Sequence, residues 1–244
     1  MRRVPVVIRV DGKNFSRVTS RSLKPYDHRL SELMVETTQY IASEIQGCCF
    51  NFTHSDEISL ILRNDQTLET EPYLGNRIQK IVSIVASLAT RGFDKALAAM
   101  EEPPQLVGDV VFDARVFTLP SLHECVNYLI WRQQDCLRNA ISGATQTHLS
   151  KKLGKKTAFN RLIGMKSSEK VQVLQDECGI DFDDDLPTGF RLGVCGYKVP
   201  IVKGDDVRNK WTSNWNMMKI SENKDHYLDI LQVGHDIIRN ENVL

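Results

Sequence analysis

The sequence lacks any long apolar run: no stretch approaches the roughly 20 apolar residues that a membrane helix requires. It also lacks net charge, because 31 Lys and Arg residues balance 31 Asp and Glu residues. With 41% hydrophobic and 25% charged residues, the composition is that of a soluble globular protein. A disordered chain is excluded, since it would have fewer apolar residues and a larger net charge. The 244 residues allow one large domain or two small ones.

Cysteine patterns that bind metals are missing too. The six cysteines form no CxxC pair, and no histidine lies at zinc-finger spacing from them. We therefore expect free thiols and a reducing, cytoplasmic environment. We recognise no signal peptide, because Met1-Arg2-Arg3 runs directly into a strand-like segment.

The neutral total conceals local asymmetry. Residues 1–30 hold eight Arg and Lys residues against Asp11 and Asp27, and residues 151–161 hold five basic residues and no acid. Such segments suit a polyanionic partner, although a run of like charges is also common on a merely solvated surface.

Strand and helix signals alternate in the first half of the chain. Strands are predicted at 4–10, 48–52, 58–62 and 109–119, and helices from 27 to 47 and over 76–100. The order β-α-β-β-α-β is that of the ferredoxin-like split βαβ unit. In this topology the first and third strands are antiparallel neighbours, so Asp11 at the end of one lies beside Asp56 at the start of the other.

The pattern changes after Pro120. Ser121 and Glu124 form a capping-box signature that opens a long helix. After it we expect a basic loop at 151–161, short helices near 157–164 and 168–177, a hairpin flanking Gly196 and a helix over 222–240. The predicted fold class is therefore α+β, with a ferredoxin-like βαββαβ core over 1–120 and a mainly helical extension with a hairpin over 121–244 packed on it.

Asp11 and Asp56 are the sharpest chemical signal. Two converging carboxylates repel each other unless a cation lies between them, and oxygen ligands suit Mg²⁺. Gly12 lets the backbone approach closely, so its carbonyl is a third candidate ligand of a two-metal site. The alternative is that Asp11-Gly12 and Asp56 are ordinary turn residues. Because strand neighbours point to opposite faces, we expect Asp56 rather than Glu57 to share the face of Asp11, with Glu57 as a hydrogen-bonding neighbour.

Basic residues are expected to surround this centre and to bind phosphates. They are Arg9, Lys13, Lys24, Arg77, Lys80, Arg115 and Arg132. For Arg77 and Lys80, which are three apart on one helical face, a solvated surface is an equal alternative.

Five ordered blocks resemble a known family. They are RVDGKNFSRVT (9–19), KPYD (24–27), SDEISL (55–60), FDARVF (112–117) and NYLIWRQQDC (127–136). Together they are similar to the tRNA-His guanylyltransferase family, and most of all to its Thg1-like branch of 3′–5′ polymerases. The similarity extends over about residues 4–140.

This resemblance implies a polymerase palm that adds nucleotides to the 5′ end of tRNA, with ATP and GTP as substrates. The 3′-hydroxyl of the incoming nucleotide would attack a 5′ end activated by a triphosphate or by ATP. By resemblance, Asp11, the Gly12 carbonyl and Asp56 hold two Mg²⁺ ions, and Lys24 and Asp27 lie near the reacting phosphates. The remaining nucleotide contacts would be Arg9, Lys13, Asn14, Phe15, Ser55, Glu57, Arg77, Lys80, Arg115, Arg132 and Asn139. The family also implies a homo-oligomer, specifically a homotetramer, with tRNA contacts from residues 121–244.

One departure from the family pattern bears on the reaction. Eukaryotic members carry His-Ile-Asn-Asn where this chain has Leu137-Arg138-Asn139-Ala140, so only Asn139 stays in register. This favours template-directed repair of 5′-truncated tRNA over dedicated addition of one G to tRNA-His. A nucleotide cyclase, which also uses a palm with two metals, stays open as an alternative. An RNA-binding module that stacks bases on its central strands is disfavoured, because residues 4–10 and 58–63 contain no aromatic residue.

Overall fold

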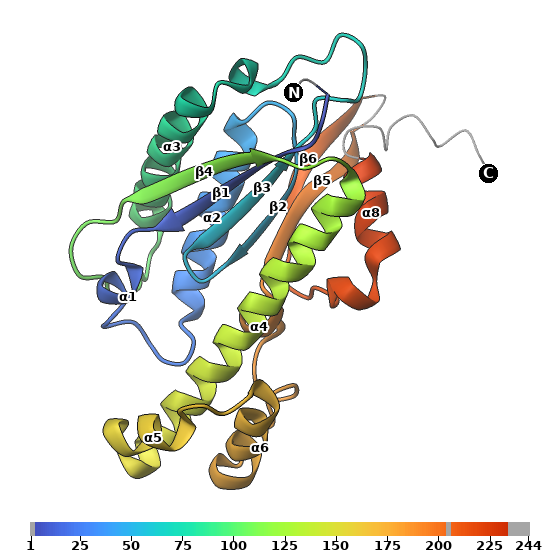
Figure 1. Cartoon of the computed structure of the whole chain (residues 1–244). Coiled ribbons are helices and arrows are strands. Elements are labelled where there is room, and N and C mark those ends of the chain that lie inside the picture. Colours follow the sequence, from blue (N-terminus) through green and yellow to red (C-terminus); the bar gives the residue numbers. More distant parts are fainter. Residues whose placement is uncertain (1–2, 204–205, 234–244) are drawn as a thin grey trace.

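The computed structural model describes residues 3–203 and 206–233 of the chain. At its centre lies a six-stranded antiparallel sheet with the strand order β4-β1-β3-β2-β5-β6 (Figure 1). The strands are β1 (Val6–Gly12), β2 (Cys48–His54), β3 (Glu57–Leu62), β4 (Phe112–Thr118), β5 (Val194–Lys203) and β6 (Asp206–Asn214). The order β4-β1-β3-β2 is that of the ferredoxin-like unit, so the predicted α+β fold class is confirmed.

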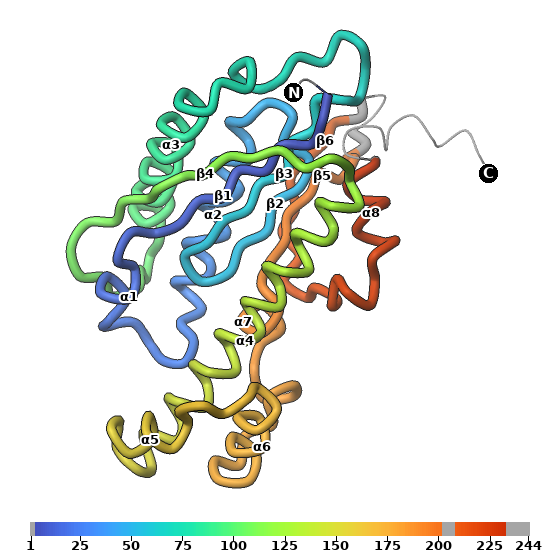
Figure 2. The backbone as a smooth tube through the Cα atoms, viewed as in Figure 1, coloured from blue at the N-terminus to red at the C-terminus, as the bar shows by residue number. Residues whose placement is uncertain are grey.

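Helices cover both faces of the sheet (Figure 2). They are α1 (Phe15–Val18), α2 (His28–Glu44), α3 (Ile78–Ala99), α4 (Leu122–Leu153), α5 (Lys155–Leu162), α6 (Ser167–Cys178), α7 (Thr188–Leu192) and α8 (Lys224–Val233), with 3₁₀ turns η1 (Tyr73–Asn76) and η2 (Ile220–Glu222). α2 and α3 pack on the face that buries Ile8 and Val10, and α4 and α8 pack on the face that buries Val7. Because side chains alternate along a strand, Arg9 and Asp11 belong to the α4 face.

The helix signals of the sequence correspond to real caps. Asp27 is the N-cap of α2, where its carboxylate accepts a hydrogen bond from the backbone N–H of Arg29 at 3.2 Å. Ser121 is the N-cap of α4, where its hydroxyl accepts a hydrogen bond from the backbone N–H of Glu124 at 3.3 Å. Each cap satisfies one of the N–H groups that a helix start leaves without a partner.

The basic segment 151–161 is not the predicted loop. α4 continues to Leu153, and α5 starts at Lys155 after the single residue Gly154, whose φ of 80° only glycine adopts easily. The lysines therefore lie on two helices at the end of the molecule farthest from β4 (Figure 1). Segment 168–177 is helical as expected, within α6.

The hairpin predicted around Gly196 is wrong in its position. Gly196 lies inside the continuous strand β5, and β5 pairs along its length with β6. A Cβ on Gly196 would lie 2.5 Å from Nε2 of Gln39 and 2.6 Å from Oδ1 of Asn51, so this glycine permits a close approach rather than a turn. β5 also pairs with β2, so the second half of the chain adds two strands to the sheet of the first half.

Two further expectations concern the thiols and the tail. All six cysteines are free, as predicted. The predicted helix over 222–240 is present as α8 up to Val233, and its remainder lies outside the described residues. Over the described ranges, every helix is too short or too polar to cross a membrane.

Candidate active site

Asp11 and Asp56 meet at one end of the sheet, as the topology predicts. Asp11 is the second-last residue of β1 and pairs with Glu57, the first residue of β3, and Asp56 lies in the turn just before it. A Cβ built on Gly12 would lie 3.1 Å from the Cβ of Asp56 and 2.6 Å from the ring of Phe15. A larger residue at position 12 would therefore separate the strand end from the turn.

The pKa values of both carboxylates are raised, first of all by burial. Burial raises the pKa of Asp11, and the charges of Glu57 and Asp113 raise it further against the opposing charge of Arg9. Burial also raises the pKa of Asp56, where the charge of Asp11 adds to the rise and a hydrogen bond from Ser55 opposes it. The Ser55 hydroxyl donates this bond at 3.0 Å. Both effects that raise the pKa disfavour the charged form, which a bound cation would favour.

Glu57 lies on the same face as Asp11, contrary to the alternation argument. That argument placed Asp56 on a strand, whereas β3 begins only at Glu57 and Asp56 is a turn residue. Glu57 is buried and accepts hydrogen bonds from Arg132, at 2.6 Å from Nε and 2.9 Å from Nη2, and from Arg9. Burial alone would raise the pKa of Glu57, but the nearby His54 and the charges of Arg132 and Arg9 lower it below its ordinary value.

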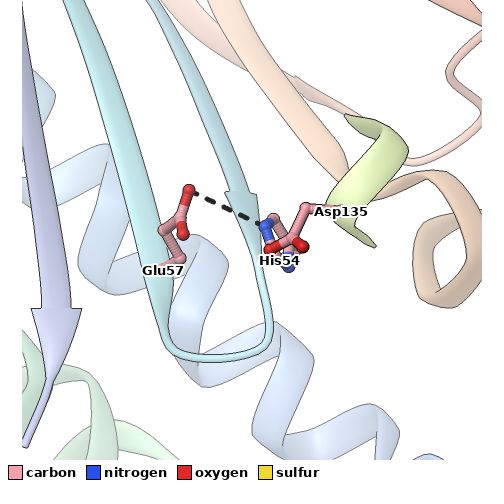
Figure 3. Close-up of side chains that lie close together, drawn as sticks. All are labelled: His54, Glu57 and Asp135. Carbon is pink, nitrogen blue, oxygen red and sulfur yellow. Dashed lines mark ion pairs between the residues drawn. The ribbon is translucent and has the colours of Figure 1, made fainter. Parts of the chain in front are cut away.

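A second cluster of side chains, which consists of one histidine and two carboxylates, lies beside Asp11 and Asp56. His54, Glu57 and Asp135 offer ligand atoms that all lie within 4.8 Å of one another, with His54 Nε2 3.7 Å from Glu57 Oε1 (Figure 3). However, Arg132 also binds Asp135 at 2.7 Å, and Arg138 binds the other oxygen of Asp135. Since guanidinium groups already neutralise both carboxylates, this group is better described as an ion-pair network than as a metal centre.

Arg132 is therefore not available to bind phosphates, contrary to the prediction from the sequence. Its side chain is only 3% exposed and is held between Glu57 and Asp135. The sequence offered a signal for this burial. Arg132 continues the stripe of Cys125, Tyr128, Leu129 and Cys136, which are spaced three and four apart and face the sheet.

Arg77 and Lys80 do not join the carboxylates within this chain. β3 starts beside Asp11 and runs away from it, so the connection to α3 leaves from the opposite end of the sheet (Figure 1). α3 then returns over 22 residues, about 33 Å, before the chain reaches Val111, whose carbonyl accepts a hydrogen bond from the N–H of Lys13. The exposed Arg115 pairs with Arg9 across β4 and β1, and so lies near Asp11.

A cavity of about 270 Å³ opens beside the turn that carries Asp56. It lies between the start of α2, the β2–β3 turn, α4 and α7, and five of the predicted site residues line it: Phe15, Lys24, Asp27, Ser55 and Asn139. Asn14, just before Phe15, has a left-handed φ of 54° at the start of α1.

Asp27 has structural partners in this cavity. Arg29 binds its two oxygens through Nε and Nη2, each at 3.0 Å, and the N–H of Leu23 donates to it at 3.1 Å. Burial would raise the pKa of Asp27, but these hydrogen bonds lower it below the ordinary value. The residue thus holds segment 23–29 against α2, whereas a role next to phosphates stays a prediction.

Two family models match the chain. One, described as tRNAHis guanylyltransferase, covers residues 1–120, and the other, described as the Thg1 C terminal domain, covers residues 123–239. Among solved structures, a bacterial tRNA(His) guanylyltransferase (Thg1)-like protein in complex with ATP is similar, with a TM-score of 0.79 and 30% identity over 95% of this chain and 91% of that chain. Such a protein in complex with GTP is similar at a TM-score of 0.76 and 30% identity, with the same coverage.

Curated relatives point the same way. The tRNA(His) guanylyltransferase of Schizosaccharomyces pombe is 30% identical over 233 residues, which are 94% of this chain and 84% of that protein. The probable tRNA(His) guanylyltransferase of Homo sapiens is 28% identical over 193 residues, which are 78% of this chain and 63% of the human protein.

Proposed function

Because the chain belongs to the tRNA(His) guanylyltransferase (Thg1) family of nucleotidyltransferases, we propose that it adds nucleotides in the 3′–5′ direction to the 5′ end of tRNA and so repairs truncated tRNA. The observation that carries this proposal is the convergence of Asp11, Gly12 and Asp56 at the end of a ferredoxin-like sheet. The ATP and GTP complexes of the bacterial neighbours support nucleoside triphosphates as substrates.

Mg²⁺ fits the donor set at this site. Asp11 and Asp56 supply carboxylate oxygens whose charges repel each other, and the Gly12 carbonyl is the third oxygen donor that we assign. Bound there, two such ions would screen phosphate charge and lower the pKa of the attacking hydroxyl. Arg9 lies 3.8 Å from Asp11, yet the pKa values of both aspartates stay raised, so we take this acidic pair to need further cations.

The residues of this chain would bind and orient the two reactants. The 3′-oxygen of the incoming nucleotide attacks the α-phosphorus at the 5′ end of the tRNA, and the bond to pyrophosphate, or to AMP after adenylylation, breaks. The hydroxyl proton passes to solvent. Arg9, which lies 3.8 Å from Asp11, and the exposed Arg115 are the cations we assign to the phosphates, and Lys24 and Asn139 contribute from the cavity.

Residues 121–244 are proposed to hold the body of the tRNA. The basic residues at the junction of α4 and α5 are exposed, namely Lys151, Lys152, Lys155, Lys156 and Arg161. Lys152 lies 17 residues beyond Asp135 on one helix, about 25 Å from the active site. That spacing suits contacts with phosphates remote from the reacting end.

The choice of the added nucleotide tests the proposal that the protein repairs truncated tRNA. A 5′-triphosphorylated tRNA transcript that lacks its first nucleotide bypasses activation, and it should receive G opposite C. After the opposing C is changed to A, it should receive U. Asp11→Ala protein is the matched control and should add nothing. Addition of G whatever the opposing base would favour the dedicated tRNA-His activity, and a cyclic product from nucleotides alone would favour a cyclase.

A further inference from the structure

The α4 face of strands β4, β1 and β3 carries three rows of side chains. The register aligns Asp113, Asp11 and Glu57 in the first row, Arg115, Arg9 and Ser59 in the second, and Phe117, Val7 and Ile61 in the third. Successive rows are two residues apart along antiparallel strands, so they follow each other at about 6.8 Å. A path along β4 and β1 therefore leads from an acidic row across a basic row to an apolar row about 14 Å away.

The β4 side of this face is open. α4 lies over β3, where the Tyr128 hydroxyl and the Ser59 hydroxyl are 2.8 Å apart and Arg132 binds Glu57. On β4, the side chains of Asp113 and Arg115 are 60% and 62% exposed. Phe117 is 37% exposed although it is a large aromatic residue.

Aromatic rings extend the third row onto α4. The ring of Tyr128 is edge-on to Phe117, with centroids 5.5 Å apart, and to Trp131, with centroids 6.1 Å apart. The guanidinium of Arg132 lies 4.3 Å from the centroid of the Trp131 ring, and Glu57 and Asp135 hold that guanidinium in place. Trp131 is nevertheless 55% exposed. Its ring is thus fixed from one side and open to a ligand on the rest of its surface.

We propose that Phe117 and Trp131 form a stacking platform for an unpaired base at the end of the RNA substrate. This inference rests on the proposed function, because it takes the RNA end to be bound at Asp11. A single-stranded RNA carries phosphates and flat rings in alternation, and the face offers Arg115 between the acidic row and the rings. The order of charges therefore matches an RNA end whose reacting 5′-phosphate lies at the carboxylates and whose unpaired base, on the strand opposite the truncated 5′ end, reaches the platform.

This platform differs from the RNA-binding arrangement that the sequence disfavours. The rejected RNA-binding module stacks bases on its two central strands, and here the central strands β1 and β3 carry no aromatic residue. The rings come instead from the edge strand β4 and from helix α4. No single sequence segment shows this combination, because it depends on where α4 crosses the sheet.

Two oligonucleotides test the proposal. One is a single-stranded RNA tetramer with a 5′-phosphate, and the other is the same tetramer with abasic residues in place of its nucleotides. Trp131→Ala and Phe117→Ala should each weaken binding of the base-containing tetramer by about 5- to 150-fold and leave binding of the abasic tetramer unchanged. Trp131→Phe should restore most of the affinity, because it keeps a ring. Leu68→Ala, which removes an 81% exposed apolar side chain outside the proposed RNA-binding surfaces, is the control and should bind like the wild type.

Three results would overturn the platform. They are unchanged binding of the base-containing tetramer by both alanine variants, an equal loss with the abasic tetramer, and a dimer in sedimentation that these variants dissociate without any loss of RNA binding. The last result would assign the face to a second copy of the chain. Binding is measured here without any reaction, so the two proposals fail separately: a wild type that extends tRNA while its Trp131→Ala variant binds RNA normally loses only the platform.

Discussion

Two acidic groups lie side by side at the same end of the sheet, and the protein treats them differently. Glu57 and Asp135 are bound by Arg9, Arg132 and Arg138, and the pKa of Glu57 is lowered despite its burial. Asp11 has only a longer ion pair among the described residues, 3.8 Å from Arg9, and burial raises the pKa of both Asp11 and Asp56. The comparison teaches that proximity of carboxylates does not identify a cation site, because the protein's own cations must be counted first.

The ion-pair network of Glu57, Asp135 and their arginine partners also positions the elements around Asp11 and Asp56. Arg132 and Glu57 connect α4 to β3, and Glu57 pairs with Asp11 across the strands. Through this bridge α4 is fixed next to the end of β1. We infer that the ion-pair network stabilises the fold, whereas Asp11 and Asp56 act in nucleotide addition. The following experiments separate these two roles.

The largest expected effect is on activity. Asp11→Ala or Asp56→Ala should lower the rate of nucleotide addition by about 10³-fold or more, because either change removes a carboxylate that we assign to hold Mg²⁺. The fold should persist, since the loss of one charge relieves the repulsion of the other. Circular dichroism and single-turnover kinetics with a 5′-triphosphorylated transcript check both parts.

Asp113→Ala is the matched control for these variants. Asp113 occupies the same row as Asp11 on the neighbouring strand, and its side chain is 60% exposed. It should keep its activity within a few-fold of the wild type. Full activity of Asp11→Ala would refute the carboxylate site, and a dead Asp113→Ala would move the chemistry toward β4.

The next effect is on stability. Glu57→Ala should destabilise the fold by about 3–5 kcal/mol, because it leaves the buried guanidinium of Arg132 with one partner fewer. Arg138→Ala removes an exposed partner of the same network and should change stability by less than about 1 kcal/mol. Urea denaturation monitored by fluorescence measures both values. Equal stability of Glu57→Ala and the wild type would mean that the network does not support α4.

The topology and the Asp11–Asp56 pair could be predicted because both follow from short-range patterns. Short runs of β-branched and other apolar residues mark the strands, and the βαββαβ order makes β1 and β3 neighbours. The same logic, carried one step further, would have placed Arg77 and Lys80 at the far end of the sheet, since β3 leads away from Asp11. The strand order in the sequence thus indicates which basic residues lie near Asp11, whereas their charges alone do not.

Other features depend on geometry that no local pattern carries. The sequence predicts the wrong face for Glu57, because β3 starts at Glu57 and not at Asp56, as the alternation of side chains would require. The contact between His54 and Asp135 depends on the crossing of α4 over the sheet. The sequence predicts a turn at Gly196, because a turn glycine and a strand glycine that makes room for Gln39 and Asn51 cannot be told apart in a sequence.

Mg²⁺ should stabilise the protein through the Asp11–Asp56 pair and not through the cluster of His54, Glu57 and Asp135. At a concentration 100-fold above its dissociation constant, Mg²⁺ should add about 2.7 kcal/mol to the free energy of unfolding of the wild type. Asp56→Asn should lose this gain, whereas His54→Gln should keep it, because the group of His54, Glu57 and Asp135 already has arginine partners. Thermal melts with and without Mg²⁺ measure the gain. Its loss in His54→Gln instead would assign the cation to the second group and reverse the comparison.

The smallest effect is on the pH dependence of the metal-free protein, and it has opposite signs in the two groups. A carboxyl whose pKa is raised on folding binds its proton more tightly in the folded state, so its stabilising contribution is complete below the ordinary value of 3.8 and is lost as the pH rises through the raised value. Glu57, whose pKa is lowered from an ordinary 4.5, contributes stability above that value and loses it as the pH falls through the lowered one. In EDTA, the stability of the wild type relative to Asp56→Asn should therefore decrease as the pH rises above 3.8, by no more than ~1.4 kcal/mol per pH unit. The stability of the wild type relative to Glu57→Gln should instead decrease as the pH falls below 4.5. If the Asp56→Asn comparison showed the same sign as the Glu57→Gln comparison, cations of the protein itself would be stabilising the Asp56 carboxylate, and the site would need no metal ion to hold its charge.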